Sequence, residues 1–302
     1  MALRIAYLIL AHKDPIFIER LTNRLVQETD NHCFIHVDAK TKAFDGIMNE
    51  SPNIHWITNR IPVYWGGYNI IEATLSLLNK AAQANFDRYM ILQGADYPLF
   101  SNTYIDRFFH DNSDVEFINA VDETVGSRRE WYRYIPKNYL DKPNVIKRLK
   151  NRLNADYWRS NLPKPRIDCT IEFDGLKHHI FRGWAHFALT HESVKYVLEF
   201  SRNHSDYNDR FRHVYAPDES YFHTIIYNSK FVDNTPNKGA ILKKDRSLEN
   251  LLNLTYCEYP SAVREFKSKD DYEYLKHTDY LFFRKASSES KDLLDWIDEH
   301  GE

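Results

Sequence analysis

The chain has 302 residues, of which 43% are hydrophobic and 27% charged, the profile of a folded globular protein with a substantial core. A net charge of −3 and a pI near 6.5 argue against a general electrostatic attraction to nucleic acid. Cys33, Cys169 and Cys257 show no CxxC spacing, so neither a disulfide framework nor a zinc site is expected, and a reducing compartment is favoured. We find no signal-peptide pattern and no uncharged run near the roughly 20 residues of a membrane span, and therefore expect a soluble protein.

The first half of the chain alternates short apolar runs with amphipathic segments. The apolar runs predict strands at residues 5–10, 33–38, 54–57, 89–92 and 115–118. Helices are expected over residues 15–27, where Asp14 caps the start, and over residues 70–84, and Ser101 marks the cap of a third helix. Strands that alternate with helices indicate an α/β protein with a mainly parallel sheet and right-handed crossovers.

Polar or aromatic side chains follow successive strands of this predicted sheet. They are His12, Asp38, Trp65 and Asp96. In open α/β sheets ligands bind at the carboxyl ends of the strands, so these residues predict a shared nucleotide or substrate cleft. Each also has an ordinary structural explanation, as a loop histidine, a turn aspartate, a core tryptophan and a helix cap.

Residues 122–174 are polar, basic and aromatic, and they include Arg128 and Trp131. Interleaved arginines and aromatic residues suit the binding of sugars or phosphates, although a solvated charged helix has the same composition. We interpret this stretch as an insertion over the cleft.

Strand character resumes at residues 180–189, and a helix is expected over residues 194–204. The chain beyond Asn253 is expected to be irregular until the apolar residues 281–285, after which Ser287 caps a final amphipathic helix. We see no internal repeat and no linker, so a single domain is the simplest interpretation.

Residues 216–226 carry the most distinctive pattern of the second half. Pro217 suits the first position of a helix, and Asp218 and Glu219 follow in the first turn, where the helix dipole favours negative charge. Adjacent helical residues point about 100° apart, so one carboxylate can face a cleft while the other caps the helix or meets solvent. A well-capped helix start explains the same residues without a function. The apolar face of this helix consists of Phe222, Ile225 and Ile226.

Six short motifs occur in a fixed order along nearly the whole chain. They are Ile35-His36-Val37-Asp38, Trp65-Gly66-Gly67, Gly94-Ala95-Asp96-Tyr97-Pro98, Gly183-Trp184-Ala185-His186-Phe187, Pro217-Asp218-Glu219-Ser220 and Phe283-Arg284-Lys285. This set resembles the core-2/I-branching β-1,6-N-acetylglucosaminyltransferases and peptide O-xylosyltransferases, glycosyltransferase family 14. The resemblance implies one GT-A-type domain over residues 1–302, with a Rossmann-like sheet flanked by helices. It also implies an inverting transfer from a UDP-sugar to a sugar or protein hydroxyl, without a metal ion or other cofactor.

The resemblance assigns two catalytic residues. Inverting transfer needs a general base for the acceptor hydroxyl, and the glutamate of the Pro-Asp-Glu motif carries that role over to Glu219. The departing diphosphate needs positive charge, and the family's tail lysine falls on Lys285. Independently of the resemblance, the sequence contains no Asp-x-Asp motif with which most GT-A enzymes hold a metal ion.

The remaining predicted site residues bind the donor or the acceptor. By resemblance Asp38 meets the uridine, and a carboxylate that accepts the uracil N–H is physically reasonable. Motif neighbourhood and strand-end position add His12, Trp65, Gly66 and Asp96 to the donor site. Trp184 either stacks on the acceptor sugar or fills the core, and the interpretation of the insertion adds Arg128 and Trp131 to the acceptor side.

One feature departs from the family pattern. Family members often carry a second cationic residue upstream of the tail lysine, and Thr255 occupies that position here. Stabilisation of the leaving group therefore lacks one charge unless Arg264, Lys267 or Arg284 replaces it. The eukaryotic members are disulfide-rich Golgi proteins with a membrane anchor; with neither pattern found, a bacterial cytoplasmic enzyme of surface-polysaccharide synthesis is favoured.

The leading hypothesis is a metal-independent glycosyltransferase with UDP-N-acetylglucosamine as its default donor and a glycan or lipid-linked oligosaccharide as its acceptor. No nucleic-acid partner is expected, and the predicted place is the cytoplasm, with peripheral association at the inner face of the membrane left open. UDP-xylose and UDP-glucuronic acid are alternative donors within the family. A catalytically silent glycan-binding protein and a nucleotide-sugar hydrolase are the competing hypotheses.

Overall fold

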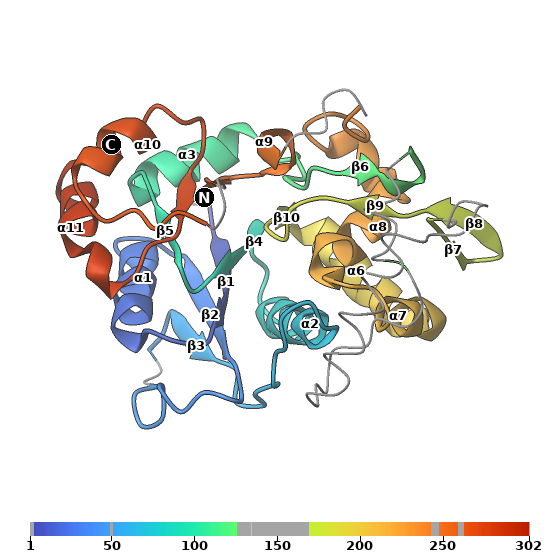
Figure 1. Ribbon diagram of the computed structural model, residues 1–302, viewed down its shortest axis with the longest axis horizontal. Coiled ribbons are helices and arrows are strands. Elements are labelled where there is room, and N and C mark those ends of the chain that lie inside the picture. Colours follow the sequence, from blue (N-terminus) through green and yellow to red (C-terminus); the bar gives the residue numbers. More distant parts are fainter. Residues whose placement is uncertain are drawn as a thin grey trace, which may run out of the picture.

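A computed structural model describes residues 3–48, 51–125, 134, 169–242, 248–258 and 263–301. Its centre is a five-stranded sheet with the strand order β10-β4-β1-β2-β3, in which only the edge strand β10 is antiparallel to its neighbour (Figure 1). The strands are β1 (Ile5–Ala11), β2 (His32–Val37), β3 (Ile54–Trp56), β4 (Arg88–Gln93) and β10 (Ala188–Thr190). The predicted mainly parallel sheet is confirmed for the first four strands.

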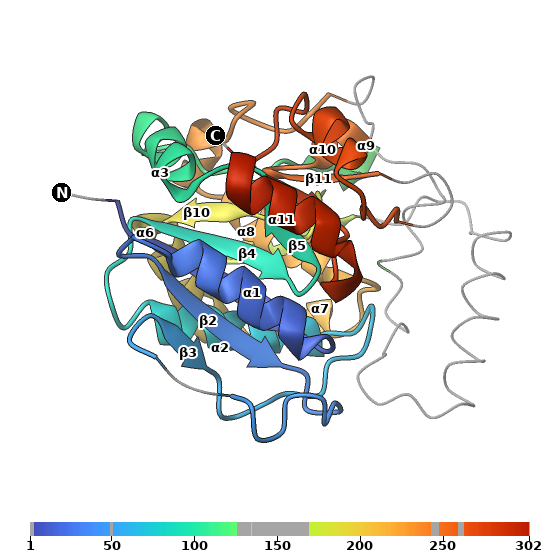
Figure 2. The ribbon, with the colours of Figure 1, turned by 90° about the vertical axis from the view of Figure 1, so that its left-hand side faces the viewer.

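Helices cover both faces of this sheet. Alternate residues of β1 point to opposite faces: Tyr7 and Ile9 lie in one apolar cluster, and Ala6 and Leu8 lie in the other. The first cluster is closed by α1 (Pro15–Val26) and α11 (Lys291–His300), and the second by α2 (Asn69–Ala81), α6 (His191–Asn203) and α8 (Tyr221–Tyr227). Figure 2 shows α1 in front of the sheet and α2 behind it. Burial on both faces explains why these strands read as continuous apolar runs.

The predicted helix caps are confirmed. The Asp14 carboxylate accepts a hydrogen bond from the backbone N–H of Phe17 at 3.2 Å, and Pro15 is the first residue of α1. Ser101 caps α3 (Asn102–Asp111) by accepting from the N–H of Tyr104 at 3.2 Å. These local bonds satisfy backbone donors that a helix start otherwise leaves unpaired.

A second, three-stranded sheet attaches the C-terminal part to the end of β4. Its order is β11-β12-β5, with β12 (Phe282–Arg284) parallel to β11 (Thr255–Cys257) and antiparallel to β5 (Asp96–Pro98). The chain beyond Asn253 is therefore not irregular, because it forms β11 and α10 (Asp270–Leu275) before β12. These strands are three residues long, which is too short for a sequence pattern to identify.

The C-terminal helix α11 is also held by charge. Arg20 of α1 contacts Asp295 and Asp298 of α11, each at 2.7 Å, and the Tyr97 hydroxyl donates to Asp298 at 2.8 Å. The capping residue Ser287 precedes a 3-10 turn, η6 (Ser288–Ser290), that leads into this helix. The tail thus packs against the first helix of the chain.

The strand predicted at residues 115–118 is wrong. Only Phe117 forms an isolated bridge there, with Ala188. Glu116 is buried instead, and its carboxylate accepts from the Thr190 N–H at 2.9 Å and the Ser193 hydroxyl at 2.8 Å. The segment therefore serves to fix the start of α6, a use that depends on a contact between residues distant in the sequence.

The apolar run at residues 180–189 divides between two sheets. Its first part forms β9 (Phe181–Arg182), which pairs with β6 (Val121–Asp122), and its last part forms β10. The other described elements are η1 (Glu123–Val125), the hairpin β7 (Thr170–Phe173) and β8 (Leu176–His179), α7 (Ser205–Phe211), η3 (Pro217–Glu219), η4 (Lys230–Asn234) and α9 (Leu248–Leu251).

The helix predicted to begin at Pro217 begins four residues later. Pro217–Glu219 form the separate 3-10 turn η3, and α8 starts at Tyr221 after a break at Ser220, whose φ of −142° is not helical. The predicted apolar face of α8 is buried, as are all seven of its residues. Glu219 therefore lies at the end of a short turn in front of a core helix, and the adjacent carboxylate Asp218 still points elsewhere because 3-10 residues are about 120° apart.

Most of the predicted insertion over residues 122–174, including Arg128 and Trp131, lies outside the described residues. Its two ends pair within the molecule, through β6 with β9 and β7 with β8. None of the helices in the described ranges has the length and hydrophobicity that crossing a bilayer demands.

Candidate functional site

The carboxyl ends of the three central strands meet at one edge of the sheet. His12 follows β1, Asp38 follows β2, and Gln93 is the last residue of β4. Backbone hydrogen bonds continue past the strands, from the Asp38 N–H to the Ala11 carbonyl and from the Gly94 N–H to the Leu10 carbonyl, both at 2.8 Å. Parallel pairing with β1 in the centre thus places these residues on neighbouring strands.

The four predicted strand-end residues are not equivalent. His12 and Asp38 directly follow their strands, but Trp65 lies nine residues after Trp56, on the loop before α2. Asp96 belongs to the second sheet as the first residue of β5. The prediction of four successive strand ends is therefore correct for two residues and wrong for the other two, which come from a loop and from another sheet.

The Asp38 carboxylate is held by a turn of its own. Its Oδ1 accepts from the backbone N–H of Lys40 at 2.9 Å and of Val63 at 3.2 Å, and its Oδ2 contacts the Lys40 ammonium. Burial opposes the charged form, but these hydrogen bonds and the lysine keep the pKa of Asp38 below its ordinary value. Asp38 is consequently a fixed anion at the end of β2. Its predicted contact with a uridine stays a prediction.

His12 marks the place where the tail reaches this edge. Burial lowers the pKa of His12, and the positive charges of Lys13, Lys40 and Lys285 lower it further, while Asp38 raises it. The Lys285 ammonium thus acts electrostatically on a residue at the end of β1. Hydrogen bonds place the tail at the same edge, because the Ala286 N–H donates to the Ala95 carbonyl at 2.9 Å and the Ser288 N–H donates to the Asp14 carboxylate at 2.8 Å. The segment that carries Lys285 therefore lies beside the segments that follow β1 and β4, although they are far apart in the sequence.

Asp96 lies in a buried polar cluster beneath this edge. Its carboxylate has no exposure to solvent, accepts from the Gln93 N–H at 2.7 Å and lies 2.7 Å from the His186 Nε2. Arg284 Nε lies 3.4 Å from the other carboxylate oxygen, and Arg284 Nη1 donates to the Gln93 side chain at 2.8 Å. Burial raises the pKa of Asp96, but His186, Arg284 and the Gln93 amide outweigh it and lower the pKa overall. Because Asp96 is fully buried, it would act on a bound donor only indirectly, by holding the Arg284 side chain in place.

The two arginines considered as replacements for the missing cation are both ion-paired. Arg264 lies 3.0 Å from Glu258 and 2.6 Å from Asp271, and 43% of its side chain is exposed. Arg284 faces Asp96 instead. Thr255 is fully buried in β11, next to the strand that carries Arg284. A role of either arginine toward a leaving group stays a prediction.

Backbone hydrogen bonds hold the turn that carries Glu219. The Ala216 N–H donates to the Gly66 carbonyl at 3.0 Å, and the Gly183 N–H donates to the Glu219 carbonyl at 2.8 Å. Gly66 has a φ of 77°, a conformation that favours glycine. The predicted donor residue Gly66 is therefore joined to the Pro-Asp-Glu turn. Trp65 beside it is 80% exposed and meets Tyr215 edge to face at 5.4 Å.

Gly183 allows β9 to approach this turn closely. A Cβ atom at that position would lie 1.9 Å from the Asn119 carbonyl oxygen and 2.6 Å from a ring nitrogen of His223. His223 is fully buried, and burial lowers its pKa to about 3, so the ring is neutral near pH 7. A side chain at position 183 would displace the strand that binds Glu219.

The surroundings of Trp184 match neither of its two interpretations, stacking on the acceptor sugar or filling the core, completely. It is half-buried, and its ring is nearly parallel to that of His186, with the centroids 6.3 Å apart. The indole is therefore packed on one side against the buried Asp96 cluster without being enclosed in the core. Its acceptor role stays a prediction.

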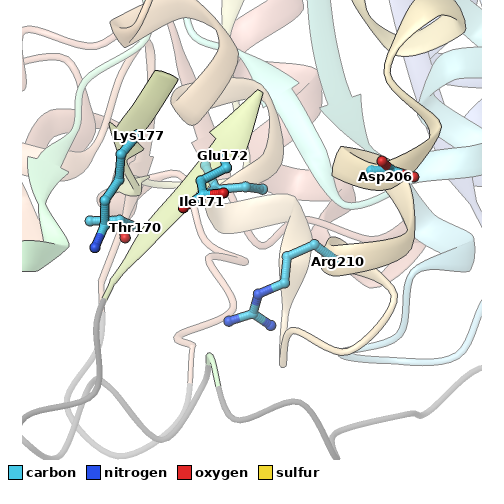
Figure 3. Close-up of a pocket in the computed structure, with 6 residues that line it drawn as sticks. All are labelled: Thr170, Ile171, Glu172, Lys177, Asp206 and Arg210. Atoms are coloured by element: carbon cyan, nitrogen blue, oxygen red, sulfur yellow. The ribbon is translucent and has the colours of Figure 1, made fainter. Parts of the chain in front are cut away.

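A separate hollow of about 430 Å³ lies on the side of the molecule formed by the β7–β8 hairpin and α7 (Figure 3). It is lined by Thr170, Ile171, Glu172, Lys177, Asp206 and Arg210. None of the predicted site residues in the described ranges lines it. Within the described ranges, no group of three or more His, Cys, Asp or Glu side chains is arranged to hold a metal ion.

Four residues near the predicted ones were missed by the sequence reasoning. They are Lys40, Gln93, Glu123 and Arg182. Lys40 carries a local signal, because an aspartate two residues before it favours a turn that its own side chain closes. The others act through contacts between distant segments, and no local pattern could have indicated them.

A family model supplies the observation that decides the family. The model described as "Branch: Core-2/I-Branching enzyme" matches residues 5–242, which contain β1 to β10 and the turn with Glu219. The chain belongs to this family of glycosyltransferases. Its mixed α/β architecture, with a mostly parallel sheet flanked by helices, is consistent with the GT-A-like fold expected from the resemblance.

Curated relatives of this family member are named xylosyltransferases. The chain is 24% identical to xylosyltransferase 2 of Canis lupus familiaris over 98% of its length and to xylosyltransferase 1 of Homo sapiens over 93%. It is 26% identical to xylosyltransferase oxt of Drosophila melanogaster over 67%. The alignments cover 33%, 28% and 22% of these relatives, so the chain spans at most about a third of their length.

The buried cluster around Asp96 generates a pH-dependent prediction. Asp96→Asn leaves Arg284 buried without a carboxylate, so the free energy of unfolding at pH 7 should fall by about 3–5 kcal/mol. Because the folded pKa of Asp96 is lowered, the carboxylate stabilises the protein above its unfolded pKa of about 4 and loses this effect as the pH falls through the folded pKa. The difference in the free energy of unfolding between wild type and variant, measured with urea, should therefore be constant from pH 7 to 5 and smaller at pH 3.5.

The matched control is Asp209→Asn, a carboxylate whose side chain is 75% exposed. It should change the unfolding midpoint little at any of these pH values. If the loss of unfolding free energy in Asp96→Asn grew as the pH fell, the assignment of a lowered pKa to Asp96 would be contradicted.

Proposed function

We propose that this protein is an inverting glycosyltransferase that transfers a sugar from a UDP-sugar to an acceptor hydroxyl without a metal ion. The observation that carries the proposal is the attachment of the tail segment with Lys285 to the segments that follow β1 and β4, at the carboxyl edge of the sheet where Asp38 also lies, in a member of a glycosyltransferase family. Fixed anionic and cationic groups at that edge suit a nucleotide and its diphosphate, since ligands of such sheets bind where the strands end.

Glu219 is the proposed general base. It takes the proton of the acceptor hydroxyl while the oxygen forms a bond to the anomeric carbon, and the bond from that carbon to UDP breaks with its electron pair going to the diphosphate. The support is structural as well as by resemblance. Glu219 ends a short turn fixed by backbone hydrogen bonds, and 24% of its side chain is exposed, which leaves it accessible.

Lys285 is the proposed cation for the departing diphosphate. Its backbone is held on both sides, by hydrogen bonds from the Lys285 N–H to the Arg264 carbonyl at 3.0 Å and from the Phe266 N–H to the Lys285 carbonyl at 2.9 Å. An ammonium aimed at a developing negative charge stabilises the transition state more than the ground state. Metal independence is supported by the absence of an Asp-x-Asp motif from the sequence and by the surroundings of Asp96, whose Oδ2 is hydrogen-bonded and whose Oδ1 faces Arg284 Nε at 3.4 Å.

The donor is proposed by resemblance to be UDP-N-acetylglucosamine. The printed names of the relatives favour UDP-xylose as the second candidate, and UDP-glucuronic acid is the third. The proposed acceptor is a glycan, including a lipid-linked oligosaccharide of a surface polysaccharide.

The experiment that tests this function measures UDP release with each of the three donors, in the presence of EDTA and with and without oligosaccharide acceptors. We expect one donor to support acceptor-dependent release, and addition of Mn²⁺ or Mg²⁺ to increase the rate little. Loss of activity in EDTA that Mn²⁺ restores would overturn the metal-free mechanism. Release without an acceptor would indicate a hydrolase, and no release with any donor would favour a glycan-binding protein.

Glu219→Gln should abolish transfer while UDP binding stays nearly intact. The amide keeps the shape of the side chain but cannot accept a proton, so the rate should fall by roughly 10²–10⁴-fold. Asp218→Asn is the matched control, because it makes the same change at the adjacent position, whose side chain points in another direction. Steady-state kinetics and calorimetry of UDP binding check both variants. The base assignment fails if Asp218→Asn is the more damaging of the two.

Lys285→Ala should lower the maximal rate by roughly 10²-fold, the scale measured for removal of one oxyanion donor, and should weaken donor binding less. Lys195→Ala, an exposed lysine of α6, is the control and should leave both parameters unchanged. Turnover of Lys285→Ala close to that of the wild type would remove this residue from the mechanism.

A further inference from the structure

We propose that Glu123 is a positioning residue that sets the strength of Glu219 as a base, acting through Arg182. The inference rests on the proposed function, in which Glu219 accepts the proton of the acceptor. Arg182 Nε lies 3.1 Å from Glu123 Oε1, and Arg182 Nη1 lies 3.6 Å from Glu219 Oε2. One guanidinium thus contacts two carboxylates, only one of which belongs to the reacting group.

The three residues are held in place by the backbone. Arg182 is the last residue of β9 and pairs with Val121 of β6, and Glu123 follows β6 with its N–H bonded to the Ile180 carbonyl at 3.0 Å. Gly183, next to Arg182, donates its N–H to the Glu219 carbonyl. Both carboxylates are therefore tied to the strand that carries the arginine, and their arrangement does not depend on side-chain contacts alone.

Burial makes the charges of this triad effective. Glu123 has no exposure to solvent, and the side chains of Arg182 and Glu219 are 12% and 24% exposed. A buried carboxylate is stable only with a partner, and Arg182 supplies a charge-assisted hydrogen bond to Glu123. The longer contact to Glu219 is outside hydrogen-bonding distance. The guanidinium is therefore bound mainly by Glu123 and acts on Glu219 through its charge.

Two opposite charges act on Glu219 in this arrangement. A cation beside a carboxylate stabilises the charged form and weakens it as a base. Glu123 offsets that effect, since its negative charge lies 3.1 Å from Nε of the same guanidinium. When Glu219 becomes neutral during the reaction, Arg182 keeps Glu123 as its counterion and is not left as an unpaired buried cation, which would be costly.

The other charged groups on the elements around this turn are compensated, neutral or directed away. From α8, His223 lies against Gly183 and is neutral near pH 7, because burial lowers its pKa to about 3. On α2, which also packs against the turn, Glu72 is paired with Arg212 at 3.0 Å. Asp218 shares the turn with Glu219 but points in another direction. Among the described residues, Arg182 and Glu123 are therefore the pair whose charges we expect to act on the base.

The test is a double-mutant cycle of Glu123 and Arg182, in which the pH dependence of kcat/KM is measured for each variant. Glu123→Gln keeps the volume and removes the charge, so the acid limb of the profile should move about one unit lower in pH. The weaker base should also reduce the rate at pH 7 by about 3–10-fold. Arg182→Gln should move the acid limb in the opposite direction. The double variant Glu123→Gln/Arg182→Gln should return it close to the wild-type position, because the two effects cancel.

A direct readout separates this inference from the proposed function. The carboxyl ¹³C signal of Glu219, assigned by its loss in Glu219→Gln, reports the charge of that residue without any turnover. Its titration midpoint should fall in Glu123→Gln and rise in Arg182→Gln. Glu116→Gln is the control for removal of a buried glutamate, since it lowers stability at the start of α6 and should not move this midpoint.

The results that would overturn the role of Glu123 differ from those that would overturn the role of Glu219. A folded Glu123→Gln protein whose Glu219 signal titrates as in the wild type overturns the inference, as do shifts of the same sign in both single variants. If Glu123→Gln does not fold, comparison of Arg182→Gln with the double variant measures the same charge. Transfer activity that persists in Glu219→Gln would overturn the proposed base, whereas the ¹³C titration would still report whether Glu123 acts on Glu219.

Discussion

Asp96 and Arg284 face each other across the antiparallel pair of β5 and β12, in a place with almost no access to solvent. A buried aspartate needs cationic or hydrogen-bonding partners, and here His186 and Arg284 provide them from two distant parts of the chain. The contact joins the tail to the end of β4, where the central sheet presents its carboxyl edge. Lys285, the next residue after Arg284, is held near this edge by the same attachment and by the hydrogen bond from the Ala286 N–H to the Ala95 carbonyl at 2.9 Å.

The turn that carries Glu219 depends on a different kind of restraint. Its position is set by backbone hydrogen bonds to Gly66 and Gly183, two residues that lie on separate segments. A side chain at position 183 would collide with the Asn119 carbonyl, so the close approach of β9 requires glycine. Backbone restraints of this kind place the turn through main-chain atoms, so its position does not depend on the carboxylate that the proposed function uses to accept a proton.

Burial also determines which groups carry charge at the site. It lowers the pKa of His36 to about 4 and that of His223 to about 3, and it lowers the pKa of His12 at the sheet edge. These rings are accordingly neutral near pH 7, and the His36 ring accepts a hydrogen bond from the Ile61 N–H at 2.9 Å. Positive charge at this edge comes from lysine and arginine side chains, among them Lys40 and Lys285.

The sequence by itself determined the central sheet, the caps at Asp14 and Ser101, and the family, because buried parallel strands, helix starts and spaced motifs are local patterns. It also indicated His12, Asp38, Glu219 and Lys285 as candidates. Only the tertiary structure decided that Glu116 fixes the start of α6 by binding Thr190 and Ser193, that Asp96 is buried against Arg284, and that Glu219 ends a separate turn. The contacts that join Glu123, Arg182 and Glu219 are also features that only the tertiary structure reveals. Each of these features rests on desolvated charges or hydrogen bonds between distant segments, whose energies depend on burial that no local pattern encodes.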